Sequence, residues 1–185
     1  MQAWKRVEPT TVQKVGFRTI VTKTFVLPDG KEASFDTVWP EGQRFVHTIA
    51  LTADKQVIVV RCFRAGPEKV MDELPGGYVD EGETSEQAAT RELFEESGYR
   101  AGTMVSLGVS HKDTYMNASW EAFLATDCQY VGKPPAHERE EAGSEVHTIS
   151  IDELIDNAKH DRMTDALAVL LGYDQLMEWR QKGHA

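Results

Sequence analysis

The N-terminal part of the chain alternates between stretches rich in β-branched or aromatic side chains and short turn sequences. Residues 12–27 form such a stretch, residues 27–31 signal a turn, and apolar positions then recur among polar ones over 33–39. We expect these segments to form a β-hairpin. Two more strands are expected at 45–51 and 56–63, and the second is apolar enough to be buried on both faces.

The C-terminal half is predicted to contain three more strands, at residues 104–109, 120–125 and 146–151. Ser150 and Glu153 have the spacing of a helix cap, which predicts a short helix that ends near Lys159. Residues 164–181 are predicted to form one C-terminal helix. Its apolar side would consist of Leu167, Leu170, Leu171, Leu176 and Met177.

A glycine-rich loop and a helix are predicted in the middle of the chain. The loop is marked by closely spaced turn residues, Pro75, Gly76, Gly77 and Gly82. Thr84 and Gln87 have the spacing of a capping box, which predicts a helix start, and Gly98 is suited to end that helix. Together, strands around a central helix and a closing helix predict a layered α/β domain.

Three glutamates of the central helix share one narrow face, because Glu92, Glu95 and Glu96 are three and four residues apart. Like charges at this spacing repel each other by roughly 0.2–0.5 kcal/mol per pair. Arg91 can relieve one charge by pairing with Glu95. A hard divalent cation such as Mg²⁺ would relieve the rest, since it prefers carboxylate and phosphate oxygens. The alternative is a solvated acidic helix face.

The composition is that of an ordinary globular protein, with 41% hydrophobic and 27% charged residues among 185. A formal net charge of −10 argues against a nucleic-acid polymer as partner, because no basic stripe is present to neutralise phosphates. The two cysteines, Cys62 and Cys128, lie in or beside apolar runs and are expected to be reduced thiols, which suits the cytoplasm. We expect no signal peptide and no membrane span.

The segment at residues 77–99, GYVDEGETSEQAATRELFEESGY, meets every fixed position of the pattern G-x5-E-x7-R-E-U-x-E-E-x-G-U, where U is apolar. It resembles the Nudix box, with an aromatic Tyr99 at the last U. The resemblance implies an enzyme that uses Mg²⁺ or Mn²⁺ to hydrolyse a nucleoside diphosphate linked to another moiety. It also implies an α/β/α sandwich with a mixed sheet between helices.

Sequences outside the box are similar to one branch of the family, the ADP-ribose and nucleoside diphosphate sugar pyrophosphatases. The similar segments are PDGKE at 28–32, VVRCFRAG at 59–66 and DELPGGYVDEGE at 72–83. In that branch the N-terminal strands form a small sheet that exchanges between two subunits, which implies a homodimer. We therefore expect an N-terminal antiparallel β extension at residues 1–43 and a Nudix domain at 44–185.

The Nudix resemblance assigns metal ligands to the box and the residue before it. Glu92 and Glu96 are the ligands it implies most directly. Glu83 is implied either as a further metal ligand or as a carboxylate that contacts the ligands rather than the metal. The carbonyl oxygen of Gly76 would complete the coordination. From the residues alone, Glu83 can instead be a charge stabilised by the positive end of the helix.

The resemblance also implies catalytic groups. Glu95 would be a ligand or the partner of Arg91, and Arg91 would either contact substrate or only orient Glu95 through a charge-assisted hydrogen bond, which we prefer. A glutamate general base is implied in the loop at 136–145. The candidates are Glu138, Glu140, Glu141 and Glu145, of which we favour Glu141. The family's base aligns near Ala142, and a solvated charged loop is the alternative.

Three positions are expected to bind substrate. Arg64 aligns with a family arginine and can bind phosphate bidentately, although a surface ion pair is equally compatible with its position. Gly77 lets the backbone of the loop approach a phosphate. Trp39 can stack on a base, as can Phe45, but aromatic residues at strand ends are more often part of a core.

The resemblance points to ADP-ribose or another nucleoside diphosphate sugar as substrate. One departure leaves the substrate open: the chain has no proline between Tyr99 and Pro134, where ADP-ribose hydrolases typically carry one some sixteen residues past the box. Hydrolysis of nucleoside triphosphates or dinucleotides is therefore an alternative. A second alternative is a nucleotide-sugar sensor without turnover, which the complete set of box carboxylates disfavours.

Overall fold

The computed structural model of this protein describes residues 3–132 and 143–181. The chain divides into two compact units. The first contains residues 1–44 together with 111–119, and the second contains 45–110 and 120–185. We predicted a domain boundary near residue 43, and whether the two units fold independently stays a prediction.

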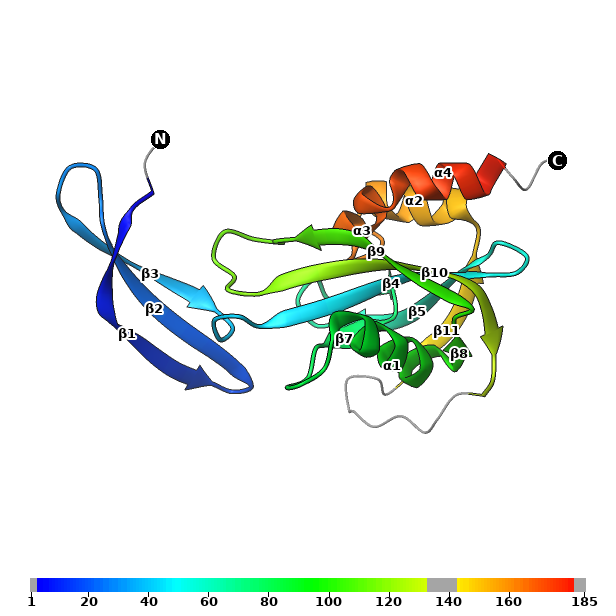
Figure 1. Ribbon diagram of the computed structural model, residues 1–185, viewed down its shortest axis with the longest axis horizontal. Coiled ribbons are helices and arrows are strands. Elements are labelled where there is room, and N and C mark those ends of the chain that lie inside the picture. The colour runs from blue at the N-terminus through cyan, green and yellow to red at the C-terminus, as the bar shows by residue number, and fades with distance from the viewer. Residues whose placement is uncertain (1–2, 133–142, 182–185) are drawn as a thin grey trace. The chain divides into compact units, whose positions relative to one another are not determined.

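The N-terminal unit is a three-stranded antiparallel sheet in the order β1-β2-β3 (Figure 1). Its strands are β1 (Lys5–Val15), β2 (Arg18–Val26) and β3 (Glu32–Val38). The predicted hairpin is confirmed as β2 and β3, whose register pairs Val26 with Glu32. The stretch predicted over 12–27 is not continuous, because the chain turns at Gly16, which has a φ of 61°. The strand before that turn escaped prediction since most of its side chains are exposed.

Segment 111–119 packs with this N-terminal sheet. Val38 donates its N–H to the carbonyl of Tyr115 (2.8 Å), and Asn117 Nδ2 donates to Thr37 Oγ1 (2.8 Å). Aromatic rings of Trp4, Phe25 and Tyr115 surround Phe35, with centroids 5.8–6.5 Å away. These contacts give the small unit its own apolar cluster.

The second unit is built on an eight-stranded sheet with the path β11-β5-β4-β10-β8. β6 pairs with β5, β7 with β4 and β9 with β10. The strands are β4 (Arg44–Thr52), β5 (Val57–Arg64), β6 (Lys69–Glu73), β7 (Gly76–Tyr78), β8 (Tyr99–Arg100), β9 (Thr103–Ser110), β10 (Ser119–Tyr130) and β11 (Glu145–Ile149). Each strand that we predicted for this part is present, and β6, β7 and β8 are additional.

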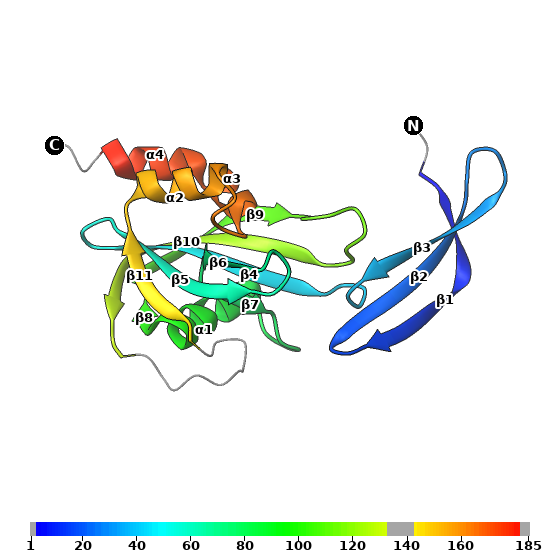
Figure 2. The ribbon, with the colours of Figure 1, turned by 180° about the vertical axis from the view of Figure 1, so that it is seen from behind.

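Helices cover both faces of this sheet, with α1 on one side and α2, α3 and α4 on the other (Figures 1 and 2). Alternation along β4 explains the two layers, since successive side chains of a strand point to opposite faces. Val46 and Ala50 pack with α1 residues, whereas Ile49 and Leu51 pack under the C-terminal helices. All of these β4 side chains are fully buried. The predicted α/β sandwich is therefore confirmed.

The C-terminal helices differ from the prediction at one point. The cap of α2 (Ile151–Lys159) is as expected, because Ser150 Oγ accepts from Glu153 N–H at 3.1 Å. The single helix predicted over 164–181 is wrong: it is split into α3 (Ala166–Leu171) and α4 (Tyr173–Gln181). The break falls at Gly172. Leu170, which was expected on the apolar side of the helix, is 69% exposed.

Gly172 is held in a tight space. A Cβ at this position would lie 2.8 Å from Ile49 Cδ1 and 3.0 Å from Leu107 Cδ1. We expect Gly172→Ala to lower the free energy of unfolding by about 1–3 kcal/mol through overpacking. Urea unfolding measures this. Gly66→Ala is the matched control, because nothing lies within 4 Å of its added Cβ, and it should change stability by no more than about 0.5 kcal/mol. Equal stability of the two variants would refute the overpacking expected at Gly172.

Cys62 and Cys128 are free and buried, which confirms the expected reduced thiols. Burial raises the pKa of each thiol to about 11. Both therefore stay protonated near neutral pH and act as small core residues. No helix within the described ranges is long and apolar enough to cross a membrane.

Candidate active site on helix α1 and the glycine loop

Helix α1 (Ser85–Ser97) begins and ends at the residues predicted for it. Thr84 Oγ1 accepts from Gln87 N–H at 3.2 Å, and Gln87 Oε1 accepts from Thr84 N–H at 2.9 Å, so the capping box is complete. Gly98 ends the helix in the left-handed conformation with a φ of 77°. These ends fix which residues face the glycine loop.

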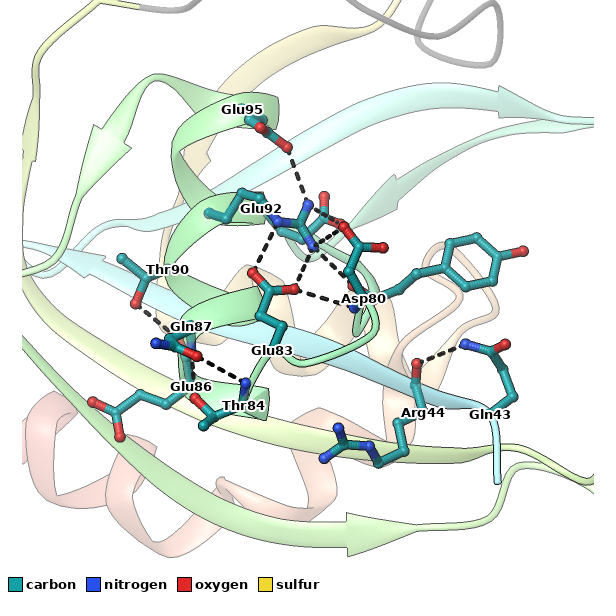
Figure 3. A network of polar contacts seen from close by, with 12 residues as sticks. Gln43, Arg44, Asp80, Glu83, Thr84, Glu86, Gln87, Thr90, Glu92 and Glu95 are labelled. Atoms are coloured by element: carbon teal, nitrogen blue, oxygen red, sulfur yellow. Dashed lines mark hydrogen bonds and ion pairs between the residues drawn. The ribbon is translucent and has the colours of Figure 1, made fainter. Parts of the chain in front are cut away.

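Carboxylates of the helix and of the loop before it, among them Glu83, Glu92 and Glu95, point toward one place (Figure 3). The guanidinium of Arg91 contacts all three. Its Nε and Nη2 donate to the two oxygens of Glu83 at 3.1 and 3.0 Å. Its Nη1 donates to Glu92 Oε1 at 2.8 Å and to Glu95 Oε2 at 3.2 Å. The pair with Glu95 was expected from the helical spacing, whereas the bidentate contact with Glu83 was not.

Negative charge exceeds positive charge around this guanidinium. Asp80 lies 3.8 Å from Arg91 Nη2, so four carboxylates share one guanidinium and exceed it by three formal charges. The Arg91 hydrogen bond lowers the pKa of Glu83, while burial raises the pKa of Glu92. The two glutamates therefore differ: the environment stabilises the charge on Glu83 and disfavours the charge on Glu92.

The glycine loop lies directly against the carboxylates of α1. Glu96 Oε2 accepts from the N–H of Gly76 at 2.9 Å. A Cβ at Gly77 would collide with Glu92 Oε1 and lie 2.6 Å from Glu92 Cδ. Gly76 pairs with His47 in the β4–β7 ladder. Backbone of the loop and two helix carboxylates thus meet at one place, as the sequence predicts.

The donors at this place suit a hard divalent cation. Every nearby donor is an oxygen, and the surplus of negative charge is the kind that Mg²⁺ offsets. Within the described part of the chain, no three His, Cys, Asp or Glu side chains converge on one point in a ready-made metal cluster. The reason is visible in the contacts: Arg91 draws Glu83, Glu92 and Glu95 to itself.

Arg64, predicted to bind substrate, is engaged within the protein. Its Nε donates to Glu73 Oε1 at 2.7 Å, and its Nη2 contacts Glu73 Oε2. Thr164 Oγ1 also donates to Glu73 Oε1, at 2.9 Å. The Glu73 hydrogen bond raises the pKa of Arg64. This ion pair is the alternative considered for Arg64 from the sequence, and a role in binding substrate stays a prediction.

Trp39, the other side chain predicted to bind substrate, belongs to the N-terminal unit. It is 8% exposed, and the guanidinium carbon of Arg18 lies 4.4 Å from its ring centroid. Its carbonyl oxygen accepts from Asn117 Nδ2 at 2.8 Å. Within its own unit Trp39 is thus a packed residue at a positive φ of 76°, and its stacking on a base stays a prediction.

The predicted general base is only partly within the described residues. Glu138, Glu140 and the favoured Glu141 lie outside them. Glu145 is described at the start of β11, where its side chain is 72% exposed and lies 3.1 Å from His147 Nε2. The choice among these four glutamates stays a prediction.

Three features of the site were missed from the sequence. Asp80 joins the cluster at Arg91, and the carbonyl of Tyr78 accepts from Arg91 Nη2 at 2.9 Å. The ring of Tyr78, which is 43% exposed as a residue, lies 4.6 Å from that of Phe45, which stacks on Trp120 at 5.0 Å. The row of three rings ends at Tyr78, a residue of the box, and its members are too far apart in sequence for a local pattern to reveal.

The opposite pKa shifts of Glu83 and Glu92 predict opposite pH effects on the metal-free protein. The lowered pKa of Glu83 means that its ion pair stabilises the fold above a pH of about 4.5 and that this stability is lost as pH falls further. Glu83→Gln should therefore be destabilising at pH 7 and much less so near pH 3.5. The raised pKa of Glu92 has the reverse sign, so Glu92→Gln should not destabilise at pH 7. Urea unfolding at both pH values measures this, and equal losses for both variants at pH 7 would contradict it.

Comparisons with known proteins give a family match and two similar curated sequences. A family model described as NUDIX domain matches residues 43–168. The chain is 36% identical over 81 residues to the ADP-ribose pyrophosphatase of Bacillus subtilis (strain 168), covering 44% of this chain and 43% of that protein. It is 35% identical over 99 residues to the ADP-sugar pyrophosphatase of Mus musculus, covering 52% and 43% respectively. The chain thus matches less than half the length of these two curated relatives.

A solved structure has the same fold over the whole chain. The crystal structure described as that of an ADP compounds hydrolase superposes with a TM-score of 0.78 and covers 100% of this chain and 97% of that one. Sequence identity in this comparison is 20%. It therefore supports the fold alone, including both the small N-terminal sheet and the larger sandwich.

Proposed function

This chain belongs to the Nudix family, and we propose that it hydrolyses the diphosphate bond of a nucleoside diphosphate sugar, with ADP-ribose as the first candidate. Water would attack one phosphorus, and the bond from that phosphorus to the bridging oxygen would break. The bridging oxygen leaves with the other phosphate, and the products are a nucleoside monophosphate and a sugar phosphate. Pyrophosphatase names among the relatives support this substrate class.

The carboxylate face of α1 against the glycine loop is the observation that carries the proposal. Glu92 and Glu96 meet the backbone at Gly77 and Gly76, and four carboxylates share the one guanidinium of Arg91. An exposed helix face with no binding role would not need glycine at Gly77 to make room for a carboxylate. This arrangement supports the Nudix roles assigned to these residues.

A divalent cation, Mg²⁺ or Mn²⁺, would be held by Glu92, Glu96 and Glu83 together with the carbonyl oxygen of Gly76. When bound, such an ion lowers the pKa of water and offsets charge on the phosphate oxygens. Raised pKa and burial suit Glu92 to this role, because a buried carboxylate that lacks sufficient positive charge has most to gain from a cation.

The chain's own groups would orient the reactants. Arg91 fixes the carboxylates of Glu83 and Glu95 through charge-assisted hydrogen bonds. The five N–H donors of Arg91 are all used, four by carboxylates and one by the carbonyl of Tyr78, so a positioning role is better supported than contact with substrate. The proton of the attacking water would pass to a loop glutamate, for which Glu141 remains our candidate.

Substrate contacts are proposed at three points. The Gly77 backbone would approach the diphosphate, Arg64 would reach a phosphate by exchanging its bond to Glu73, and Trp39 would stack on the base. We also keep the predictions of a homodimer formed through the N-terminal strands, of small-molecule rather than nucleic-acid partners, and of a cytoplasmic location.

A substrate panel tests this function. A nucleoside diphosphate sugar carries no terminal phosphate monoester and therefore resists alkaline phosphatase. Its cleavage yields two monoesters, which release phosphate in a coupled assay. The panel should contain ADP-ribose, other nucleotide sugars, dinucleotides and nucleoside triphosphates, each assayed with Mg²⁺ and with Mn²⁺. Triphosphates are assayed without the coupling enzyme, by detection of released pyrophosphate. We expect the highest kcat/KM for a nucleotide sugar. Activity restricted to triphosphates would refute the substrate class, and absence of all activity would favour a binding role.

A further inference from the structure

A buried carboxylate outside the box contacts the segment that leads into the glycine loop. Asp165 is 2% exposed and belongs to the connection between α2 and α3. Its Oδ2 accepts from the N–H of Leu74 at 3.1 Å, and its Oδ1 lies 3.3 Å from Nδ1 of His47. None of these three residues is part of the carboxylate face described above.

Asp165 does not perform the local role that its position offers. It stands at the N-cap of α3, where aspartate usually accepts a hydrogen bond from the first turn of its own helix. Here the side chain makes no such cap, and only the backbone carbonyl of Asp165 accepts, from Ala168 N–H at 2.9 Å. The carboxylate instead reaches residues distant in sequence, which means that the fold gives up a cap for another contact.

Both contacts of Asp165 lead to the backbone at Gly76. Leu74 precedes Gly76 by two residues, and His47 is the residue paired with Gly76 in the β4–β7 ladder. Between them, Thr48 N–H donates to the carbonyl of Pro75 at 2.8 Å. The Gly76 N–H in turn donates to Glu96. Asp165 thus supports, from the opposite face of the sheet, the short segment whose amide meets a proposed metal ligand.

We propose that Asp165, through His47 and the Leu74 amide, is a positioning residue that holds the Gly76 backbone in register with Glu96. This inference rests on the proposed function, because it takes Gly76 and Glu96 as parts of the metal site. Burial makes these contacts of Asp165 important, because a buried carboxylate is costly to leave unpaired. Groups bonded directly to metal ligands typically contribute roughly 10- to 100-fold to metal affinity or activity, and Asp165, which acts one step further from the ligands, is expected at the lower end of this range.

Direct measurement of metal binding tests the proposal. We expect Asp165→Ala to raise the Kd for Mn²⁺, measured by titration calorimetry, by about 10-fold or more, and to lower kcat on ADP-ribose more than it changes KM. Asp165→Asn should lie between wild type and Asp165→Ala, because its side-chain oxygen still accepts from the Leu74 amide. An Mn²⁺ Kd equal to that of the wild type in either variant, folded by circular dichroism at the assay temperature, would overturn the proposal.

Asp72→Asn is the matched control. Asp72 is 4% exposed and also lies on the strand before the glycine loop, but its carboxylate holds Arg61 and Asn157. The variant should lose folding stability and keep the Mn²⁺ affinity. If Asp165→Ala is unfolded, the comparison of Asp165→Asn with Asp72→Asn decides. The proposal would be overturned if both variants bound Mn²⁺ more weakly than the wild type, or if neither did.

A metal-free readout separates this proposal from the proposed function. The backbone amide resonance of Gly76 in a ¹H–¹⁵N spectrum should shift in Asp165→Asn and change much less in Asp72→Asn. If the wild-type protein binds no Mn²⁺ and cleaves nothing in the panel, the proposed function fails, yet this shift still reports whether Asp165 positions the loop. An unchanged Gly76 resonance in Asp165→Asn would overturn the positioning role even in an active enzyme.

Discussion

Replacing Glu96 by glutamine is expected to lower kcat on a nucleotide sugar by at least about 100-fold, more than loss of a residue behind the ligands would cause. Glutamine has the same shape, and its side-chain oxygen can still accept from the Gly76 amide, so the fold should be kept. What the variant lacks is the negative charge needed to bind a hard cation. Steady-state kinetics at saturating Mg²⁺ measure the loss.

Glu86→Gln provides the matched control for this experiment. Glu86 lies in the first turn of the same helix and is exposed to solvent. The Glu86→Gln substitution removes the same charge from α1 at a position away from the glycine loop. The activity of this variant should therefore stay close to that of the wild type. Near-normal turnover by Glu96→Gln, or an equal loss in Glu86→Gln, would mean that Glu96 is not a ligand.

Gly77→Ala and Gly76→Ala should fail in different ways, although they are neighbours. A Cβ at Gly77 would collide with the end of the Glu92 side chain, which can move aside. A Cβ at Gly76 would collide with the backbone carbonyl of Val46 and lie 3.0 Å from the Cα of His47, which cannot move without opening the β4–β7 ladder. We therefore expect Gly77→Ala to impair metal binding and Gly76→Ala to impair folding.

The expected sizes make this pair of variants a sharp test. Gly77→Ala should lower kcat/KM by about 100-fold or more, as for a displaced ligand, with a change in unfolding free energy of less than about 1 kcal/mol. Gly76→Ala should cost about 3 kcal/mol or more. Kinetics and urea unfolding of both variants give the two numbers. A Gly77→Ala enzyme with wild-type kinetics would show that Glu92 does not need its present position.

The central helix could be predicted because its determinants are local. Thr84, Gln87 and Gly98 set its ends through contacts within four residues, and the helical repeat then places the carboxylates on one face. The strands β4 and β5 were equally clear, since a run of buried apolar residues carries its own signal. For this reason the box and the sheet behind it were placed correctly.

Features that depend on distant partners could not be predicted. The tight space at Gly172 is formed by Ile49 and Leu107, which the chain brings together only on folding. Arg64 on β5 pairs with Glu73 on the neighbouring strand β6, and the short strand β6 was not expected. The contacts of Asp165 with β4 and the segment before Gly76 likewise have no counterpart in the local sequence.

The measurement that tests the central claim most directly is product analysis of ADP-ribose hydrolysis by the wild-type protein in ¹⁸O-labelled water with Mg²⁺. We predict AMP and ribose phosphate as the products, with one ¹⁸O atom in the phosphate of one of them, and no products when the metal is chelated. Unchanged ADP-ribose and unchanged nucleotide sugars, with the protein folded and Mg²⁺ or Mn²⁺ present, would contradict the account.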